Sequence, residues 1–301
     1  MPMFLHFLSF MLHQQLGSQR LERQPEPNAL TDAEENIVQY DRVMTTKLVI
    51  VYAAGLTIVH RCRPEGQKHH AIDLACGPGH YTLCLGRYLG YEEITGIDLS
   101  SGMVDIANRN SQQQGMADRV RFKVADVTRL ENIGNATVDL ASFTGAAHHM
   151  PDLQTVQRVL NEMDRITKPE GFVMAMDLAR LRTAELTERY VNILGADYRQ
   201  RGLPDFFQDF RNTMYAAWTV EELHQAIPKD SRRYWCHIVP RGLPSLQVLL
   251  GLPVGRKKIF LRSGFPWSDD QNPVAPEMRQ EWNLMRWSLL WGSRRLIAPK
   301  N

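Results

Sequence analysis

The sequence predicts an α/β protein built on a doubly wound, mostly parallel sheet. Short apolar runs alternate with stretches of helical periodicity between residues 71 and 178, which is the pattern of βαβ units. A glycine-containing turn follows the first run, and acidic residues stand near the ends of the first three. Because ligands of such sheets bind outside the carboxyl ends of the strands, residues at those ends are the candidates for function.

Composition and charge indicate a globular protein and give no sign of a nucleic-acid-binding surface or of a disulfide framework. The chain has 301 residues, enough for two domains or for one large α/β domain with insertions. Its 35 Lys+Arg nearly balance 33 Asp+Glu, with a formal net charge of +2, so no broad electrostatic surface for nucleic acid is expected. The four cysteines contain no C-x-x-C pair, which is typical of reduced thiols in a cytoplasmic protein.

Residues 1–60 are predicted to form a helical extension. The apolar run within 1–16 lacks the basic start of a secretory signal and is shorter than the roughly 20 residues that span a bilayer. We therefore expect an amphipathic helix that docks on the protein body or on a second subunit. Thr31 or Asp32 can cap a second helix, which carries Tyr40 and extends to about Val59.

The central domain is predicted at 61–263. Its expected strands are 71–75, 93–99, 120–127, 137–143 and 171–178, and its expected helices are 81–89, 102–114 and 153–166. Two further strands are expected at 234–239 and 257–261, joined by a segment that is punctuated by glycine and proline, 241–255.

Two helical additions are expected around this domain. An aromatic-rich helical stretch at about 180–217 is the natural lid over an acceptor pocket, because it follows the carboxyl end of a strand. A capping box, Thr219 with Glu222, then begins a helix that ends near Pro228. Residues 264–301 are predicted to form a helical tail whose tryptophans bury the helix or make a dimer contact, Trp282, Trp287 and Trp291.

The turn after the first strand is the strongest functional signal. Glycines at 77 and 79 let the backbone pass close to a ligand, and the next helix offers free N–H groups. Asp98 ends the second strand about 20 residues later, where a carboxylate can accept both hydroxyls of a ribose. Thr82 replaces the third glycine of a dinucleotide motif, and an acid before the loop is unhelpful beside a pyrophosphate. Three acids better suit a cationic nucleoside without phosphate, Asp73, Asp98 and Asp126.

At these residues the sequence resembles the class I S-adenosylmethionine-dependent methyltransferases, from residue 71 to about 178 and more loosely to 263. Asp73-Leu74-Ala75-Cys76-Gly77-Pro78-Gly79 looks like the first motif of that family, with Ala75 where many members have glycine. Gly96-Ile97-Asp98-Leu99-Ser100-Ser101-Gly102-Met103 and Val124-Ala125-Asp126-Val127 look like the motifs after the second and third strands. The resemblance implies a Rossmann-like sheet of seven strands, mostly parallel with the last antiparallel. It also implies S-adenosyl-L-methionine as cofactor and S-adenosyl-L-homocysteine as product.

The resemblance further implies a role for each matched residue. The loop cradles the methionine part, Asp98 holds the ribose, and Leu99 and Met103 flank the adenine. Asp126 accepts from the adenine amino group, and the backbone N–H of Val127 donates nearby. The implied cofactor-binding set is Asp73, Ala75, Gly77, Pro78, Gly79, Asp98, Leu99, Met103, Asp126, Val127 and Phe143.

The end of the fourth strand is the candidate catalytic place. His148 or His149 can take a proton from a hydroxyl or an amine, although a structural histidine at the start of the next helix explains the pattern as well. Candidate acceptor contacts are Tyr40, His148, Asp177 and Arg180, with a structural ion pair as the alternative for the last two. No metal is expected, because adjacent side chains rarely converge and a carboxylate-rich pattern is not evident.

The predicted function is methyl transfer from S-adenosylmethionine to a small-molecule acceptor, at oxygen, nitrogen or carbon, by in-line displacement. The N-P-P-Y motif of several amino-group methyltransferases is absent from the sequence, so DNA is disfavoured as acceptor. Neither a nucleic-acid partner nor a membrane span is expected, and a homodimer is left open. The alternatives are a non-catalytic S-adenosylmethionine-binding regulatory or assembly protein and an NAD-dependent oxidoreductase.

Overall fold

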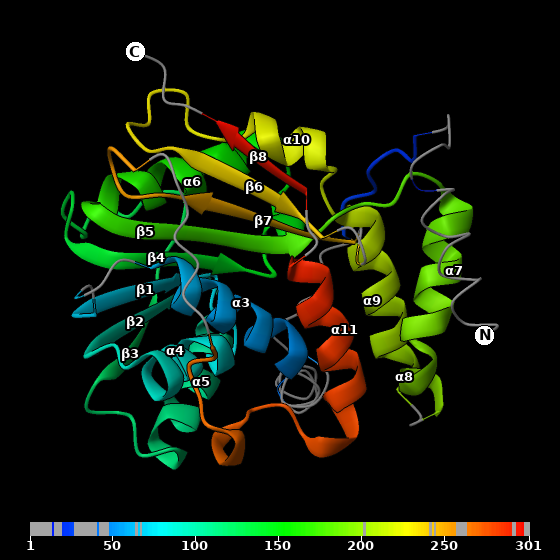
Figure 1. Cartoon of the computed structure of the whole chain (residues 1–301), viewed down its shortest axis with the longest axis horizontal. Coiled ribbons are helices and arrows are strands. Elements are labelled where there is room, and N and C mark those ends of the chain that lie inside the picture. Colours follow the sequence, from blue (N-terminus) through cyan, green and yellow to red (C-terminus); the bar gives the residue numbers. More distant parts are fainter. Residues whose placement is uncertain are drawn as a thin grey trace.

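The computed structural model shows one mixed sheet with helices on both of its faces (Figure 1). It describes residues 14, 20–26, 41, 48–63, 66, 68–200, 203–240, 243, 245–256, 264–290 and 293–297. The strands are β1 (His70–Leu74), β2 (Glu93–Asp98), β3 (Val120–Val124), β4 (Val138–Thr144), β5 (Thr167–Leu178), β6 (Trp235–Val239), β7 (Leu246–Gly251) and β8 (Ser293–Ile297). The helices are α3 (Val49–Cys62), α4 (His80–Leu89), α5 (Ser101–Gln113), α6 (Leu153–Ile166), α7 (Ala184–Leu194), α8 (Ala196–Gln200), α9 (Pro204–Ala216), α10 (Val220–Gln225) and α11 (Arg279–Leu290). Short 3-10 turns lie at η1 (Ala147–His149), η2 (Asp269–Gln271) and η3 (Pro276–Met278).

The sheet has the order β3-β2-β1-β4-β5-β7-β6-β8. β1 to β5 are parallel, whereas β7 is antiparallel to β5, β6 to β7, and β8 to β6. The order reverses at β1, which lies between β2 on one side and β4 on the other. This is the switch point at which doubly wound sheets bind ligands, so the ends of β1 and β4 are neighbours at the place where a site is expected.

Two apolar layers hold the helices against the sheet. On one face α3, α4 and α5 pack on residues of the strands, and α11 packs on α3. On the other face α6 buries Val156, Val159, Leu160 and Met163, a spacing that places all four on one side of a helix. Strands alternate with helices along the chain because each helix has one apolar face, which it buries against the sheet. The predicted α/β class is confirmed.

The central elements agree closely with the expectation. The helix predicted at 153–166 has those bounds, Ser100 caps α5 by accepting from the N–H of Met103, and the capping box of Thr219 and Glu222 is formed. The helix expected to end near Val59 continues to Cys62, and its beginning lies outside the described residues. The strand expected at 120–127 ends at Val124.

The expected sheet of seven strands, with the last strand antiparallel, is confirmed by β1 to β7, and β8 adds an eighth strand at the edge of the sheet within the described residues. Residues 246–251 were expected to be part of a connection, but they form β7, which is buried along its whole length between β5 and β6. The reason is that glycine and proline lie at both ends of a continuous apolar run, which is typical of a buried strand. The strand predicted at 257–261 lies outside the described residues.

The tail is only partly helical. α11 carries Trp282, which is buried, and Trp287, which is half exposed, whereas Trp291 lies outside the described residues. Residues 293–297 form β8, which pairs with β6 and so brings the tail into the sheet. Residues 293–297 include Arg294 and Arg295, so they lack the continuous apolar run by which the other strands are recognised in sequence. The predicted division into extension, central domain, lid and tail stays a prediction.

The helices α7, α8 and α9 form a group beyond the carboxyl end of β5 (Figure 1). Their own small core consists of Leu181, Leu186, Val191 and Met214. α9 also contacts η1 at the end of β4, so this group lies beside the predicted catalytic place. Within the described ranges, the structure contains no helix with the length and apolarity that a membrane crossing requires.

Candidate functional site at the carboxyl edge of the sheet

The turn between β1 and α4 is held in a backbone conformation that favours glycine. Ala75, Gly77 and Gly79 all have positive φ, at 51°, 52° and 81°. A Cβ on Gly79 would meet the ring of Phe122 at 2.5 Å, whereas a Cβ on Gly77 would have nothing within 4 Å. The loop is therefore packed tightly on the sheet at Gly79 and open at Gly77. The left-handed conformation of Ala75 is one that glycine adopts without steric cost.

Asp98, at the end of β2, is attached to this loop by its carboxylate. Oδ2 accepts from the backbone N–H of Gly77 at 2.8 Å, and Oδ1 accepts from the N–H of Ser100 at 3.0 Å. An ionised carboxylate has about four acceptor positions. Both oxygens of the half-buried Asp98 can therefore still accept a further hydrogen bond at the switch point.

Asp73, at the end of β1, faces inward. Thr82 donates to its Oδ2 at 2.6 Å, and Ser142 donates to its Oδ1 at 2.8 Å. The pKa of Asp73 is raised to about 6. Burial is the largest cause and the nearby Asp98 carboxylate also raises the pKa, whereas the two hydrogen bonds lower it. The side chain therefore joins β1 to α4 and β4, and it is 2% exposed.

Asp73→Asn is expected to change how stability depends on pH. Because the folded-state pKa lies above the ordinary value of 3.8, the folded state binds the proton more tightly. The free energy of unfolding should therefore fall as pH rises from about 4 to about 6. The amide removes this contribution, so the variant should gain about 2–3 kcal/mol relative to the wild type between pH 4 and pH 7. Urea unfolding across that range measures the difference, with Asp118→Asn, at an exposed acid, as control. If the free energies of unfolding of the variant and the wild type changed in parallel with pH, the raised pKa of Asp73 would be contradicted.

The other predicted cofactor residues differ in their access to the surface. Leu99 is 73% exposed directly after Asp98, an unusual position for a large apolar side chain. Asp126 is also exposed, and its Oδ1 accepts from the N–H and the hydroxyl of Thr128. The side chains of Met103, Val127 and Phe143 are buried in the core. A ligand at this edge would therefore meet the last three mainly through their backbone.

The predicted catalytic histidines lie on η1, directly after β4. His148 is buried, and its Nδ1 is 2.7 Å from Oδ1 of Asp177, whose Oδ2 accepts from the backbone N–H of His148 at 2.9 Å. Burial lowers the pKa of His148, but the Asp177 carboxylate and, more weakly, Glu26 raise it by more, so the net shift is upward. Asp177 fixes both the ring and the backbone of His148, which makes it a positioning residue.

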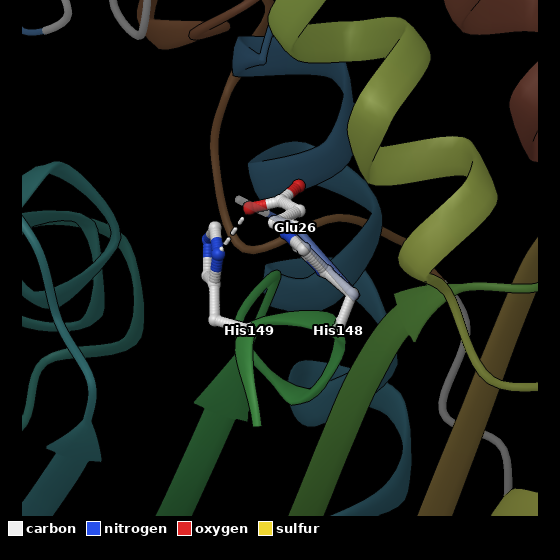
Figure 2. Close-up of side chains that lie close together, drawn as sticks. All are labelled: Glu26, His148 and His149. Atoms are coloured by element: carbon white, nitrogen blue, oxygen red, sulfur yellow. Dashed lines mark ion pairs between the residues drawn. The ribbon is translucent and has the colours of Figure 1, made fainter. Parts of the chain in front are cut away.

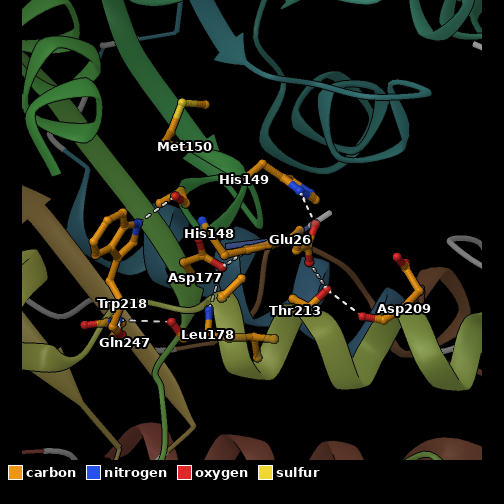
Figure 3. A network of polar contacts seen from close by, with 12 residues as sticks. Glu26, His148, His149, Met150, Asp177, Leu178, Asp209, Thr213, Trp218 and Gln247 are labelled. Atoms are coloured by element: carbon orange, nitrogen blue, oxygen red, sulfur yellow. Dashed lines mark hydrogen bonds and ion pairs between the residues drawn. The ribbon is translucent and has the colours of Figure 1, made fainter. Parts of the chain in front are cut away.

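His149 pairs with a residue that the sequence did not single out. Its Nδ1 lies 2.6 Å from Oε2 of Glu26, and Oε1 of Glu26 accepts from Thr213 of α9 at 2.6 Å (Figure 3). Burial raises the pKa of Glu26, but the hydrogen bond and charge of His149, the charge of His148 and the hydrogen bond from Thr213 together lower it to about 2. Glu26 is therefore ionised at neutral pH.

Arg23 holds the segment 20–26 across the carboxyl end of β4. Its guanidinium donates to four carbonyl oxygens, and its Cζ lies 3.8 Å from the centre of the Trp218 ring. The carbonyl groups are those of His148, Met150, Pro151 and Ala216. This arrangement brings Glu26 to the histidines from more than 120 positions earlier in the chain.

The other two predicted acceptor contacts, Arg180 and Tyr40, differ from His148 and Asp177 in what the structure shows of them. Arg180 is buried and donates to the carbonyls of Leu21 and Ala217 and to Glu222. These contacts hold the segment 20–26 and the start of α10, so we assign Arg180 a structural role. Tyr40 lies outside the described residues. Its neighbour Asp41 contacts His80 and Asn110 at 2.7 and 2.8 Å, next to the glycine loop.

Sequence reasoning missed Glu26, Arg23 and Asp41 because nothing in a linear pattern indicates which distant segment crosses the sheet edge. It also expected that adjacent histidine side chains would not converge. On the tight turn η1 they do, with ring centres 4.1 Å apart. A polar residue next to proline, as in Glu26-Pro27, is a weak signal that no spacing rule would have selected.

Comparison with known proteins identifies the central part of the chain. Residues 71–171 match a family described as a methyltransferase domain. A demethylmenaquinone methyltransferase of Leptospira interrogans is 27% identical over 113 residues, 38% of this chain and 44% of that protein. An uncharacterised methyltransferase of Bacillus subtilis is 29% identical over 175 residues, 56% of this chain and 65% of that protein. The chain thus spans less than two thirds of these relatives.

Solved structures agree in fold over a larger part of the chain. A protein of Methanococcus maripaludis described as an S-adenosylmethionine-dependent methyltransferase has a TM-score of 0.55 at 18% identity, covering 78% of this chain and 100% of that chain. A protein of Nostoc punctiforme described as an O-methyltransferase has a TM-score of 0.51 at 17% identity, covering 83% of this chain and 69% of that chain. Residues 71–171 of the chain thus match a methyltransferase domain, and the sheet that contains them has the fold of solved S-adenosylmethionine-dependent methyltransferases.

Proposed function

We propose that this protein transfers a methyl group from S-adenosylmethionine to a small-molecule acceptor, at oxygen, nitrogen or carbon. One observation carries the proposal. β1 and β4 are hydrogen-bonded neighbours, so the glycine loop and Asp98 lie at the same sheet edge as His148 and His149. A cofactor subsite next to groups that can accept a proton is what alkylation of a hydroxyl, amine or acidic carbon requires.

The residues at this edge fit the cofactor. Asp98 retains acceptor positions for ribose hydroxyls, and the open side of Gly77 lets a ligand approach the loop backbone. Exposed Leu99 offers an apolar surface for a base, and Asp126 offers a carboxylate for an amino group. The hydroxyl of Thr144, at the end of β4, is buried and has no hydrogen-bond partner within the described part of the chain, so a ligand can satisfy it. The bound sulfonium supplies the methyl group and the leaving group.

The histidines are the proposed proton acceptors. Asp177 binds Nδ1 of His148, which selects the tautomer with a proton on that atom and leaves Nε2 as an acceptor. Oε2 of Glu26 lies 2.6 Å from Nδ1 of His149 and orients that ring. His149 is the more accessible of the two, with 34% of its side chain exposed.

A small acceptor is supported by the relatives and by the charge of the chain. Several curated relatives are named for demethylmenaquinone, a small molecule, and a net charge of +2 gives no reason to expect nucleic acid.

No disulfide joins the four cysteines, all of which are described, in agreement with a cytoplasmic location. The exposed Leu284 and Trp287 on α11 offer a surface for a homodimer.

Calorimetric titration with S-adenosylmethionine, S-adenosylhomocysteine and NADH tests the cofactor. We expect micromolar binding of the first two by the wild type and at least a 100-fold loss in Asp98→Ala, since a carboxylate hydrogen-bonded to two hydroxyls contributes on the order of 3 kcal/mol. Asp118→Ala removes an exposed acid before β3, at the opposite edge of the sheet, and should bind as the wild type does.

The outcomes separate the alternatives. Binding of NADH alone would overturn the proposal in favour of an oxidoreductase. Cofactor binding without transfer to any acceptor in a screen with radiolabelled methyl donor would favour the regulatory or assembly role. Unchanged affinity in Asp98→Ala would remove the ribose assignment.

A further inference from the structure

Three possible metal ligands converge where the segment 20–26 meets the end of β4. Glu26, His148 and His149 each offer one ligand atom, and these atoms lie within 4.8 Å of one another. Figure 2 shows the Glu26 carboxylate between the two imidazole rings. The convergence depends on the tight turn η1, which turns two consecutive side chains toward one point, and on Arg23, which fastens the segment carrying Glu26.

His148 is held as metal-binding histidines are held. Such histidines almost always give their second ring nitrogen to a carboxylate or a carbonyl, which fixes ring and tautomer. Asp177 does this at Nδ1 of His148, at 2.7 Å, so the nitrogen left for a ligand is Nε2. The support behind this first ligand is therefore already in place.

Glu26 and His149 need only a small separation to admit an ion. Their facing atoms, Oε2 and Nδ1, are 2.6 Å apart. Donors bound to one first-row ion at about 2.1 Å lie roughly 3.0–3.4 Å from each other. The side chain of His149 is partly exposed and can rotate, and Oε1 of Glu26 stays bonded to Thr213.

We propose that Glu26, His148 and His149 form a binding site for one divalent transition-metal ion, of which Zn²⁺ is the probe of choice. Two imidazole nitrogens and one carboxylate oxygen suit zinc or iron, whereas Mg²⁺ and Ca²⁺ prefer oxygen ligands alone. Three protein ligands leave a coordination position for water or for an oxygen of a bound molecule. The proposal does not rest on methyl transfer, because it concerns ion binding by this chain's own side chains; with the ion bound, His148 and His149 would be ligands and would not accept a proton.

The test is a Zn²⁺ titration of the full chain after chelator treatment and desalting, in competition with a chromophoric indicator. We expect one ion per chain. Glu26→Gln and His149→Gln should each weaken binding at least tenfold, and Asp177→Asn should weaken it about 10–100-fold through His148. Circular dichroism checks that each variant is folded.

A matched control is present on the surface. His69 and Glu92 form a similar pair at 2.8 Å, with both side chains about two-thirds exposed. His69→Gln should leave the affinity and stoichiometry unchanged. The visible spectrum of the Co²⁺ form provides a second measurement, since its ligand-field bands should be lost in His149→Gln.

Three results would overturn the proposal. They are the absence of stoichiometric binding by the wild type, equal affinity of the wild type and the folded His149→Gln variant, and a loss of binding in His69→Gln. The first two would leave Glu26 and His149 as an ion pair only. Cofactor titration on the same samples keeps this result separate from the proposed function, because Asp98 is not among the ligands.

Discussion

Gly79→Ala is expected to destabilise the protein by about 2–5 kcal/mol. A methyl group at this position would lie 2.5 Å from Cζ of Phe122 and 3.0 Å from Cβ of Ala107, so β3 or α5 must move. Overpacking of this kind costs about 1–3 kcal/mol, and a non-glycine residue at a φ of 81° adds about 1–2 kcal/mol. Urea unfolding measures the loss, which is a large part of the stability of an ordinary domain.

Gly77→Ala is the matched control two residues away. Its φ of 52° imposes a similar backbone cost, but a Cβ there has nothing within 4 Å. We expect a loss of only about 1–2 kcal/mol in stability together with weaker cofactor binding, because the methyl group narrows the open side of the loop. If both variants lost the same stability, tight packing at Gly79 would not be the cause.

Arg23→Met should release the segment 20–26 from the sheet edge. The variant loses charge-assisted hydrogen bonds to four carbonyl groups and the stacking on Trp218. Each such bond contributes about 1.5–3 kcal/mol when its partner is left unsatisfied, and the stacking about 0.5–2 kcal/mol. Because the site is partly solvated, we expect a net local loss of about 3 kcal/mol, which raises the equilibrium constant for opening of the segment roughly 100-fold.

Amide hydrogen exchange measures this opening. The N–H groups of Leu21 and Gln24, which donate to the carbonyls of Arg182 and Tyr215, should exchange faster in Arg23→Met. Exchange within β1 and β4 should stay as it is. Arg199→Met removes an arginine that lies over Phe207 and makes one side-chain hydrogen bond, and it should leave the segment unchanged. Unaltered exchange at Leu21 and Gln24 would show that Arg23 does not hold the segment.

The agreement between sequence and structure is best where an element is decided by its own residues. The turn at 75–79 follows from glycines that tolerate positive φ, and α6 follows from an apolar face and the capping residue Asp152. β8 could not be predicted in the same way, because it exists only through its pairing with β6. β7 is not evident in the sequence, because glycine and proline next to a short apolar run are typical of a connection as well as of the ends of a buried strand.

The sequence by itself determined the doubly wound class, the glycine loop, the acids at the strand ends and the two histidines after β4. Each of these features can be predicted from residues that are close together in the sequence, since periodicity, capping and turn chemistry act over a few residues. Only the tertiary structure decided which partners the histidines have. Asp177 comes from the adjacent strand, and Glu26 comes from a segment held in place by Arg23. Such pairings depend on packing between residues far apart in the chain, which no local pattern encodes.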